Sequence, residues 1–233
     1  MSSIPPFFIT GTDTEVGKTH FSVRWLRHRC DKGVPGVVYK PVASGVEDIV
    51  PEGEANPDVI ALSRASGNDM SELCLHTYRH PMAPEMARRL EGDGPSPDQI
   101  INWCKERIRP NAAFEGIGGL FVPLHGRFCV ADLIRELELP VVLVARAGLG
   151  TVNHTLLSVR AVRDMDIKLA SVVVSMEMNR GTPVEEKAIH YLKERLFPIP
   201  LGMLEHSPLN SSLSDSERDF FTVFDDILKN QGT

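Results

Sequence analysis

The chain has 233 residues and a formal net charge of -6, with 42% hydrophobic and 24% charged residues. These values are ordinary for a soluble globular protein and argue against a nucleic-acid partner, which usually demands a basic face. No stretch approaches the roughly 18 uninterrupted apolar residues of a membrane helix, and the four cysteines form no Cys-x-x-Cys pair. We therefore expect a cytoplasmic protein with no nucleic-acid and no membrane partner.

The first part of the chain predicts strands and helices in alternation. Short apolar runs bounded by breakers predict strands over residues 7–10 and 36–39. Between them, apolar positions on one face predict a helix that begins near Lys18 and stops at residues 32–33. Farther along, Asn56 as N-cap and Pro57 at the first helical position predict the start of another helix.

The same alternation continues to the end of the chain. Helices are expected over residues 84–90, 97–108, 153–164 and 183–196, and strands over 112–116, 141–145 and 169–174. The 112–116 run is shorter and less apolar than a central strand should be, whereas 141–145 is a continuous β-branched run. Residues 207–216 predict a surface loop before a last helix. Strands alternating with helices predict a largely parallel sheet in one domain spanning residues 1–233.

A glycine-rich turn falls between the first strand and the first helix. It begins at Gly11 and continues through Thr12, Asp13, Thr14, Glu15, Val16, Gly17, Lys18 and Thr19. Such a turn exposes backbone N–H groups and the positive end of the helix dipole, and both favour a polyphosphate. Lys18 adds a charge for the β- and γ-phosphates, and the Thr19 hydroxyl can ligate Mg²⁺. We expect an α/β, P-loop NTPase-like fold, with a mostly parallel central sheet and helices on both faces.

Four motifs resemble those of the dethiobiotin synthetase family. The loop has five residues between its glycines, which is that family's spacing rather than the usual four. Residues 39–45 (Tyr-Lys-Pro-Val-Ala-Ser-Gly) resemble its second motif, and residues 115–119 (Glu-Gly-Ile-Gly-Gly) its acidic, glycine-rich strand end. Residues 148–154 resemble the loop before its dimer-interface helix. The motifs occur in the family's order across most of the first two-thirds of the chain.

The resemblance implies a ring closure that depends on ATP and Mg²⁺. The substrates would be 7,8-diaminopelargonic acid and CO2, which combine to a carbamate. A carbamate oxygen would attack the γ-phosphate to give a mixed carbamic–phosphoric anhydride. The second amine would then displace phosphate and close the ureido ring of dethiobiotin. A homodimer is implied in the same way.

The resemblance also implies roles for particular residues. Lys18 and Lys40 would be catalytic, because fixed cations stabilise charge that builds on the transferring phosphoryl group. The nucleotide would be bound by Thr12, Asp13, Thr14, Glu15, Val16, Gly17, Lys18, Thr19, Glu115 and Ser175. The metal ligands would be Thr19, Asp58 and Glu115. The substrate would be bound by Thr14, Ser44, Gly148, Leu149, Gly150, Thr151, Val152 and Asn153.

Several of these residues have a plain structural alternative. A lone lysine at a strand end, such as Lys40, is commonly only solvated, and Asp58 would favour the first turn of its helix through the dipole alone. Thr151 or Asn153 could simply cap the next helix. His76 and His80 are spaced as ligands on a helix would be, but Pro81 follows at once, which favours solvated loop histidines.

The chain departs from the family pattern at three places, one of which is the thin strand at residues 112–115. Ser175 and Met176 stand where many members have Asn-Asp, whose polar groups read the adenine base, and neither offers a bidentate amide edge. Glu85 stands where a histidine is often found in the substrate-side loop, which residues 79–85 resemble only loosely.

Three other functions remain open on the sequence. An amidotransferase-type relative would normally carry a further glutaminase domain. A switch or partitioning ATPase would place a second lysine early in the loop, where Lys18 is the only one. A non-catalytic binding relative would be expected to have lost some of Lys18, Lys40, Asp58 and Glu115, and all four are present.

Overall fold

The computed structural model describes residues 3–49, 53–176 and 182–231. Its centre is a six-stranded sheet in which every neighbouring pair is parallel. In spatial order the strands are β12 (Leu201–Leu204), β11 (Leu169–Ser175), β10 (Val141–Arg146), β1 (Phe7–Gly11), β7 (Ala112–Gly119) and β2 (Val37–Tyr39). The predicted α/β fold is confirmed.

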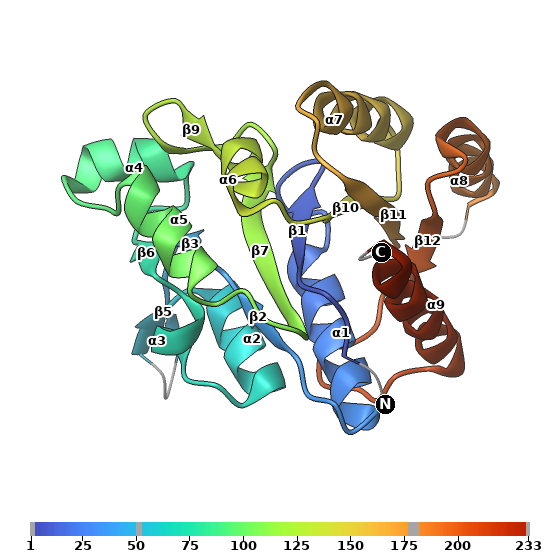
Figure 1. The fold of residues 1–233 in the computed structure, drawn as a ribbon, viewed down its shortest axis with the longest axis horizontal. Helices are drawn as coiled ribbons and strands as arrows, with labels where there is room; N and C mark the ends of the chain where they lie inside the picture. Colours follow the sequence, from blue (N-terminus) through green and yellow to red (C-terminus); the bar gives the residue numbers. More distant parts are fainter. Residues whose placement is uncertain (1–2, 50–52, 177–181, 232–233) are drawn as a thin grey trace.

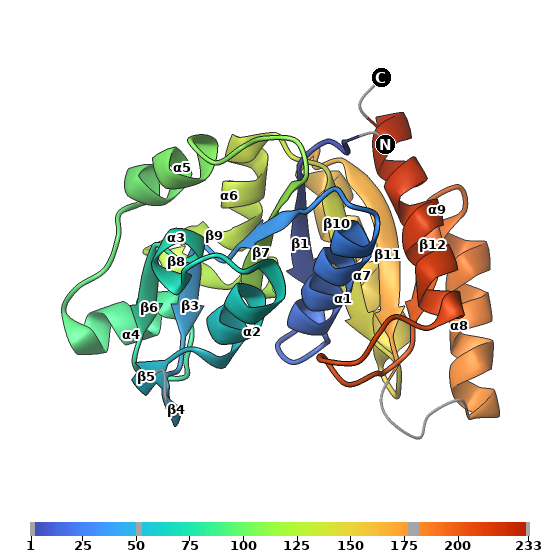
Figure 2. The same ribbon diagram turned by 90° about the horizontal axis from the view of Figure 1, so that it is seen from below.

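Helices cover both faces of the sheet (Figures 1 and 2). One face carries α1 (Lys18–Asp31), α2 (Pro57–Ser66) and α9 (Asp215–Gln231). The other carries α6 (Val130–Leu137), α7 (Thr151–Asp164) and α8 (Pro183–Leu196), with α5 (Pro97–Lys105) against α6. Two further helices, α3 (Met70–Leu73) and α4 (Pro84–Glu91), lie beyond the β2 edge. Among the described residues, no helix is long and apolar enough to cross a membrane.

Three two-stranded ladders complete the described strands. They are β3 (Val42–Ser44) with β6 (His76–Tyr78), β4 (Glu47–Ile49) with β5 (Gly53–Ala55), and β8 (Pro123–His125) with β9 (Phe128–Cys129). The first is parallel and the other two are antiparallel. All three lie on the side of the sheet that ends in β2, so this end of the molecule is built from short connections rather than long helices.

The core is formed where the sheet is covered on both faces. The apolar residues of β1 and β10 are fully buried, as continuous apolar runs in a covered parallel sheet should be. Aromatic rings join β1 to the helices: Phe7 contacts Trp25 of α1 and Phe224 of α9, with ring centroids 5.1 and 5.6 Å apart. This packing fixes β1 and α1, and therefore the turn between them.

The predicted start of α2 is confirmed in detail. Asn56 is its N-cap, and the side-chain oxygen accepts from the backbone N–H groups of Asp58 and Val59 at 3.1 and 3.2 Å. Pro57 occupies the first turn, where its missing N–H costs nothing. The Asn56 amide also donates to the carbonyls of Ser44 and Gly45, at 3.0 and 2.8 Å. One side chain therefore ties α2 to the end of β3.

The strand expected over residues 112–116 is present, but it is longer and more central than its composition indicates. β7 runs over eight residues in the middle of the sheet, between β1 and β2, and Glu115 is fully buried within it rather than at its end. The pairing of β7 with β1 shifts register between Ile9 and Gly11. As a result, Gly119 of β7 lies opposite Gly11, where the loop begins. Helix α6, strand β12 and the three small ladders were not predicted, and α7 begins two residues before the expected start.

Candidate functional site

The loop between β1 and α1 contains two residues in the left-handed conformation. Gly17 takes a left-handed conformation (φ 95°) as the N-cap of α1, and Glu15 is left-handed as well (φ 57°). Val16 is buried, whereas Asp13, Thr14 and Glu15 are exposed. The loop therefore turns its N–H groups and the start of α1 toward the carboxyl edge of the sheet, as an anion site requires.

Gly17 is the position where a side chain should do most damage. A Cβ added there would lie 2.8 Å from the Cβ of Ser175, and the left-handed backbone costs a non-glycine residue about 1–2 kcal/mol. We expect Gly17→Ala to lower both the melting temperature and the affinity for AMPPNP, measured by thermal unfolding and calorimetry. Gly67→Ala is the matched control, because Gly67 is also left-handed but its added Cβ meets nothing. Equal effects in both variants would mean that the contact with Ser175 is unimportant.

Glu115 lies at the centre of the polar site. Its Oε1 accepts hydrogen bonds from the Thr19 hydroxyl at 2.8 Å and from Lys40 Nζ at 2.7 Å, and Oε2 accepts from the Ser22 hydroxyl at 2.6 Å. Because a buried carboxylate is costly unless it is paired and hydrogen-bonded, these three donors account for its position. Ser22 was not among the predicted residues, although it follows Thr19 by three positions and so shares its helix face.

Asp58 reaches the same point from α2. Its Oδ2 lies 2.7 Å from Lys40 Nζ, so the ammonium bridges the carboxylates of Asp58 and Glu115. The structure therefore brings together four residues predicted from distant parts of the chain: Thr19, Lys40, Asp58 and Glu115. Lys40 is 2% exposed and is not a solvated lysine.

The two lysines of the site differ in their electrostatic surroundings. Burial and the neighbouring charge of Lys40 lower the pKa of Lys18 to about 8, and its Nζ donates to the Asp13 carbonyl at 3.0 Å. Burial alone would also lower the pKa of Lys40, but the carboxylates of Glu115 and Asp58 raise it above its usual value. For Asp58, burial opposes ionisation while Lys40 lowers its pKa. The two carboxylates thus stabilise the charged form of Lys40, whereas burial disfavours the charged form of Lys18.

Ser175, at the end of β11, lies against the loop. It is buried and faces Gly17, which places it beside the first turn of α1. The next residue, Met176, donates its backbone N–H to the Leu204 carbonyl at 2.9 Å and packs near Val174 and Ile189. The carboxyl end of β12 therefore lies beside that of β11, at the same edge of the sheet.

The turn before α7 leads into a helix N-terminus that has no side-chain cap, although the Thr151 N–H donates to the Gly148 carbonyl at 3.2 Å. Gly150 is a left-handed N-cap (φ 89°) with no side-chain cap, and Leu149 beside it is fully exposed. Thr151 is buried, and its hydroxyl has no hydrogen-bond partner among the described residues. No hydrogen bond within the described ranges joins residues 148–153 to Lys18, Lys40 or Ser44. Ser44 itself lies half-buried at the end of β3, next to the Asn56 cap.

The expectation of solvated loop histidines is correct for His80 and wrong for His76. His80 lies 2.8 Å from Glu91 and is exposed, as expected of a loop histidine. His76 instead lies in β6 with its Nε2 buried, and its ring contacts Tyr78 at 4.4 Å. Among the described residues, no group of three His, Cys, Asp or Glu side chains is arranged to hold a metal.

Comparisons with known proteins agree with this site. A family described as an AAA domain matches residues 6–208. The ATP-dependent dethiobiotin synthetase BioD of Anaeromyxobacter sp. (strain K) is 38% identical over 201 residues, covering 85% of each chain. That of Acidiphilium cryptum (strain JF-5) is 37% identical over 211 residues, covering 87% of this chain and 93% of its own. The chain belongs to the dethiobiotin synthetase family.

The fold of this dethiobiotin synthetase family member is shared more widely. A plasmid partition protein from Borrelia burgdorferi superposes with a TM-score of 0.54, covering 98% of this chain and 100% of that one. The two are 10% identical, so the likeness shows the fold alone.

Glu85, where dethiobiotin synthetases often have a histidine, has a local structural role here. It is buried at the start of α4 and pairs with Arg88 and Arg89 at 2.9 and 2.7 Å. It also accepts a hydrogen bond from the Gly126 backbone at 2.8 Å. The hydrogen bonds from Arg88 and Gly126 hold the pKa of Glu85 well below its usual range. We infer that Glu85 ties α4 to the turn between β8 and β9.

Proposed function

We propose that the chain is an ATP-dependent dethiobiotin synthetase, a single-domain cytoplasmic enzyme. It would close the ureido ring of dethiobiotin from 7,8-diaminopelargonic acid and CO2. The observation that carries this proposal is the meeting of Thr19, Lys40, Asp58 and Glu115 at the carboxyl edge of the sheet, in a chain of that family, with Lys18 close enough to feel their charges. Two cations beside a phosphate-binding loop suit the charge that builds during phosphoryl transfer.

The roles of the chain's own residues follow from their positions. The backbone N–H groups of the loop would bind the phosphates, apart from that of Thr12, which donates to the Val144 carbonyl at 2.9 Å. Lys18 would follow the γ-phosphoryl group with its mobile charge. Lys40, fixed by two carboxylates, would stabilise the same group from the opposite side as the carbamate oxygen attacks. Phosphate would leave when the second amine attacks the carbamate carbon. Thr14 and Ser44 would orient the diamine through their hydroxyls, as the resemblance implies.

Mg²⁺ fits the residues at the centre of the site. Thr19, Asp58 and Glu115 provide oxygen ligands, the kind that Mg²⁺ prefers. The carboxylates of Asp58 and Glu115 already share one cation, the Lys40 ammonium, and the Thr19 hydroxyl donates to Glu115. We propose that these three residues hold the ion. Bound Mg²⁺ would neutralise negative charge on the β- and γ-phosphates.

The substrate carboxylate would bind at a second subunit of a homodimer. The N-terminus of α7, with Gly148 to Asn153, suits a carboxylate because no side chain caps it. Leu149 is fully exposed and Leu157 of the same helix is 61% exposed. Apolar side chains in such positions support a subunit interface over this helix.

One reaction tests the proposal. The protein is mixed with 7,8-diaminopelargonic acid, bicarbonate, Mg²⁺ and ATP, and dethiobiotin and phosphate are measured by mass spectrometry. We expect both products in equal amounts and neither without the diamine. Phosphate release without the diamine would point to a switch ATPase, and no product with any triphosphate would point to a non-catalytic binding protein.

Base selectivity is expected to be weak. Ser175 is buried against Gly17 and Met176 packs into the core, so neither presents an amide edge to a base. A pocket without that partner loses discrimination. We expect turnover with CTP and GTP at rates within about tenfold of the ATP rate, measured as kcat/KM for each. Strict dependence on ATP with a low KM would contradict this prediction.

A further inference from the structure

The segment of residues 205–214, between β12 and α9, borders the nucleotide loop. It leaves the carboxyl end of β12, the neighbour of β11, whose last residue Ser175 faces Gly17. His20, directly after Thr19 on α1, has its Nε2 3.2 Å from the Ser207 carbonyl oxygen. The rings of His20 and His206 stack with centroids 5.7 Å apart. In an open α/β sheet this edge is where the rest of a nucleotide lies once its phosphates occupy the loop.

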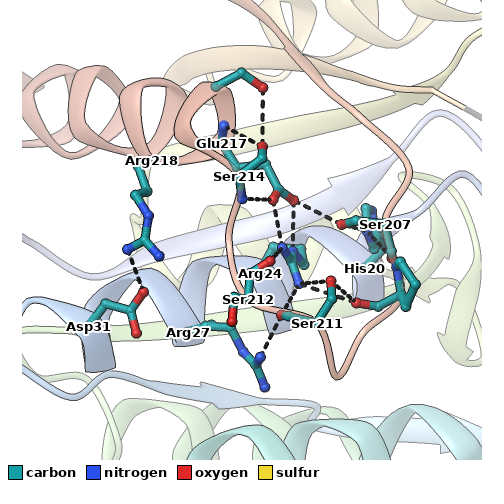
Figure 3. Close-up of polar contacts among 12 residues, drawn as sticks. His20, Arg24, Arg27, Asp31, Ser207, Ser211, Ser212, Ser214, Glu217 and Arg218 are labelled. Atoms are coloured by element: carbon teal, nitrogen blue, oxygen red, sulfur yellow. Dashed lines mark hydrogen bonds and ion pairs between the residues drawn. The ribbon is translucent and has the colours of Figure 1, made fainter.

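Arg24 holds this segment from α1 (Figure 3). The side chain is fully buried, and its guanidinium forms a fork with Glu217 of α9, Nε to Oε1 at 2.7 Å and Nη2 to Oε2 at 2.6 Å. The remaining N–H groups donate to three carbonyls of the segment, those of Pro208, Ser211 and Ser212, at 3.2, 2.8 and 3.0 Å. All five donors of the guanidinium are therefore used.

Glu217 fastens the two ends of the same segment. Its Oε1 accepts from the Ser207 hydroxyl at 2.9 Å, and its Oε2 accepts from the Ser214 backbone N–H at 2.8 Å. The segment thus wraps around one buried ion pair, and Leu213 near its end packs into the core. Its outer residues, His206 and Leu209 among them, are exposed.

A second ion pair shows what joining the two helices requires. Arg29 of α1 pairs with Asp225 of α9 at 2.6 Å, and both are as buried as Arg24 and Glu217. Arg29 also donates to the Asn111 side-chain oxygen at 2.8 Å, away from the segment. This second pair therefore joins α1 to α9 without contacting the segment. The carbonyl contacts of Arg24 serve the segment.

We propose that Arg24, paired with Glu217, is a positioning residue that holds residues 205–214 against the nucleoside end of the bound triphosphate. The inference rests on the proposed function only for the identity of the triphosphate. Arg24 touches the segment and not the phosphates, so its effect should fall on the part of the ligand that carries the base and ribose. A ligand made of phosphates alone should not sense it.

The experiment compares two ligands on three variants of the full chain. Dissociation constants for AMPPNP and for inorganic tripolyphosphate, both with Mg²⁺, are measured by calorimetry for wild type, Arg24→Lys, Glu217→Gln and Arg29→Lys. Lysine keeps the positive charge but cannot form the fork or reach three carbonyls. We expect Arg24→Lys and Glu217→Gln to weaken AMPPNP by about tenfold, a change of about 1.4 kcal/mol, and to leave tripolyphosphate within twofold. Arg29→Lys should change neither.

Other outcomes would overturn the proposal. Equal weakening of both ligands would mean that Arg24 acts through the loop or through general stability. Unchanged AMPPNP affinity would mean that the segment does not meet the nucleoside. If Arg24→Lys does not fold, Glu217→Gln carries the same test, because it weakens the fork while leaving the arginine in place. If the variants show this pattern of affinities but the wild-type protein forms no dethiobiotin, the proposed function is refuted and the role of Arg24 stands.

Discussion

Replacing Lys40 with glutamine is expected to lower kcat by at least about 10²-fold while nucleotide affinity stays within a few-fold. The ammonium is buried, permanently charged and fixed 2.7 Å from each of two carboxylates, so it needs no reorganisation when charge develops on the phosphoryl group. The phosphates of bound nucleotide are held mainly by the loop and Lys18. Steady-state turnover and AMPPNP calorimetry measure the two effects separately. Unchanged kcat in a folded variant would remove Lys40 from the catalytic set.

The same substitution should also destabilise the protein. Glu115 is fully buried, and removing one partner of a buried ion pair costs about 3–5 kcal/mol because it leaves the other charge uncompensated. Glutamine still offers an N–H donor, so the loss should lie near the lower value. The control is the double variant Lys40→Gln and Glu115→Gln, which removes both charges. It should recover part of the melting temperature but none of the activity.

The phosphate end of the site could be predicted because its signals are local. The strand at β1, the glycine at 17 and the cap at Asn56 each depend on backbone conformations that a few neighbouring residues dictate. The motif at residues 39–45 added Lys40, whose partners come from α2 and β7. Sequence order says nothing of those partners; the parallel sheet brings them to one edge.

The length and central position of β7, and the burial of Arg24, depend on contacts between distant elements. β7 is rich in alanine and glycine, and it is a central strand because β1 and β2 pair with it on both sides. Arg24 looks like an ordinary surface arginine of a helix, yet it is fully buried because α9 supplies Glu217 from nearly 200 residues later. Ser22 could have been found, since its spacing from Thr19 places both hydroxyls on one helix face.

Replacing Lys18 with methionine should abolish activity and yet stabilise the unliganded protein. The substitution removes the mobile cation for the γ-phosphate, so we expect turnover to fall by at least about 10²-fold and AMPPNP affinity to fall as well. Unlike Lys40, Lys18 has no carboxylate within ion-pair distance among the described residues, and burial lowers its pKa from 10.5 to about 8. A folded-state pKa below the unfolded value means that the charged form is disfavoured in the fold. Methionine, of similar length, removes that cost.

The stability difference between wild type and Lys18→Met should depend on pH. Below pH 8 Lys18 is protonated in both the folded and the unfolded chain, and the full penalty, about 3 kcal/mol for a shift from 10.5 to about 8, is present. Between pH 8 and 10.5 the folded protein loses the proton first, so wild-type stability rises relative to the variant. We therefore expect Lys18→Met to have the higher melting temperature at pH 7 and the difference to vanish toward pH 10.5. The hydrogen bond from Lys18 to the Asp13 carbonyl offsets part of the gain. A variant that is less stable than wild type at pH 7 would contradict the prediction. It would mean that the hydrogen bond to Asp13 stabilises the fold by more than the buried charge of Lys18 destabilises it.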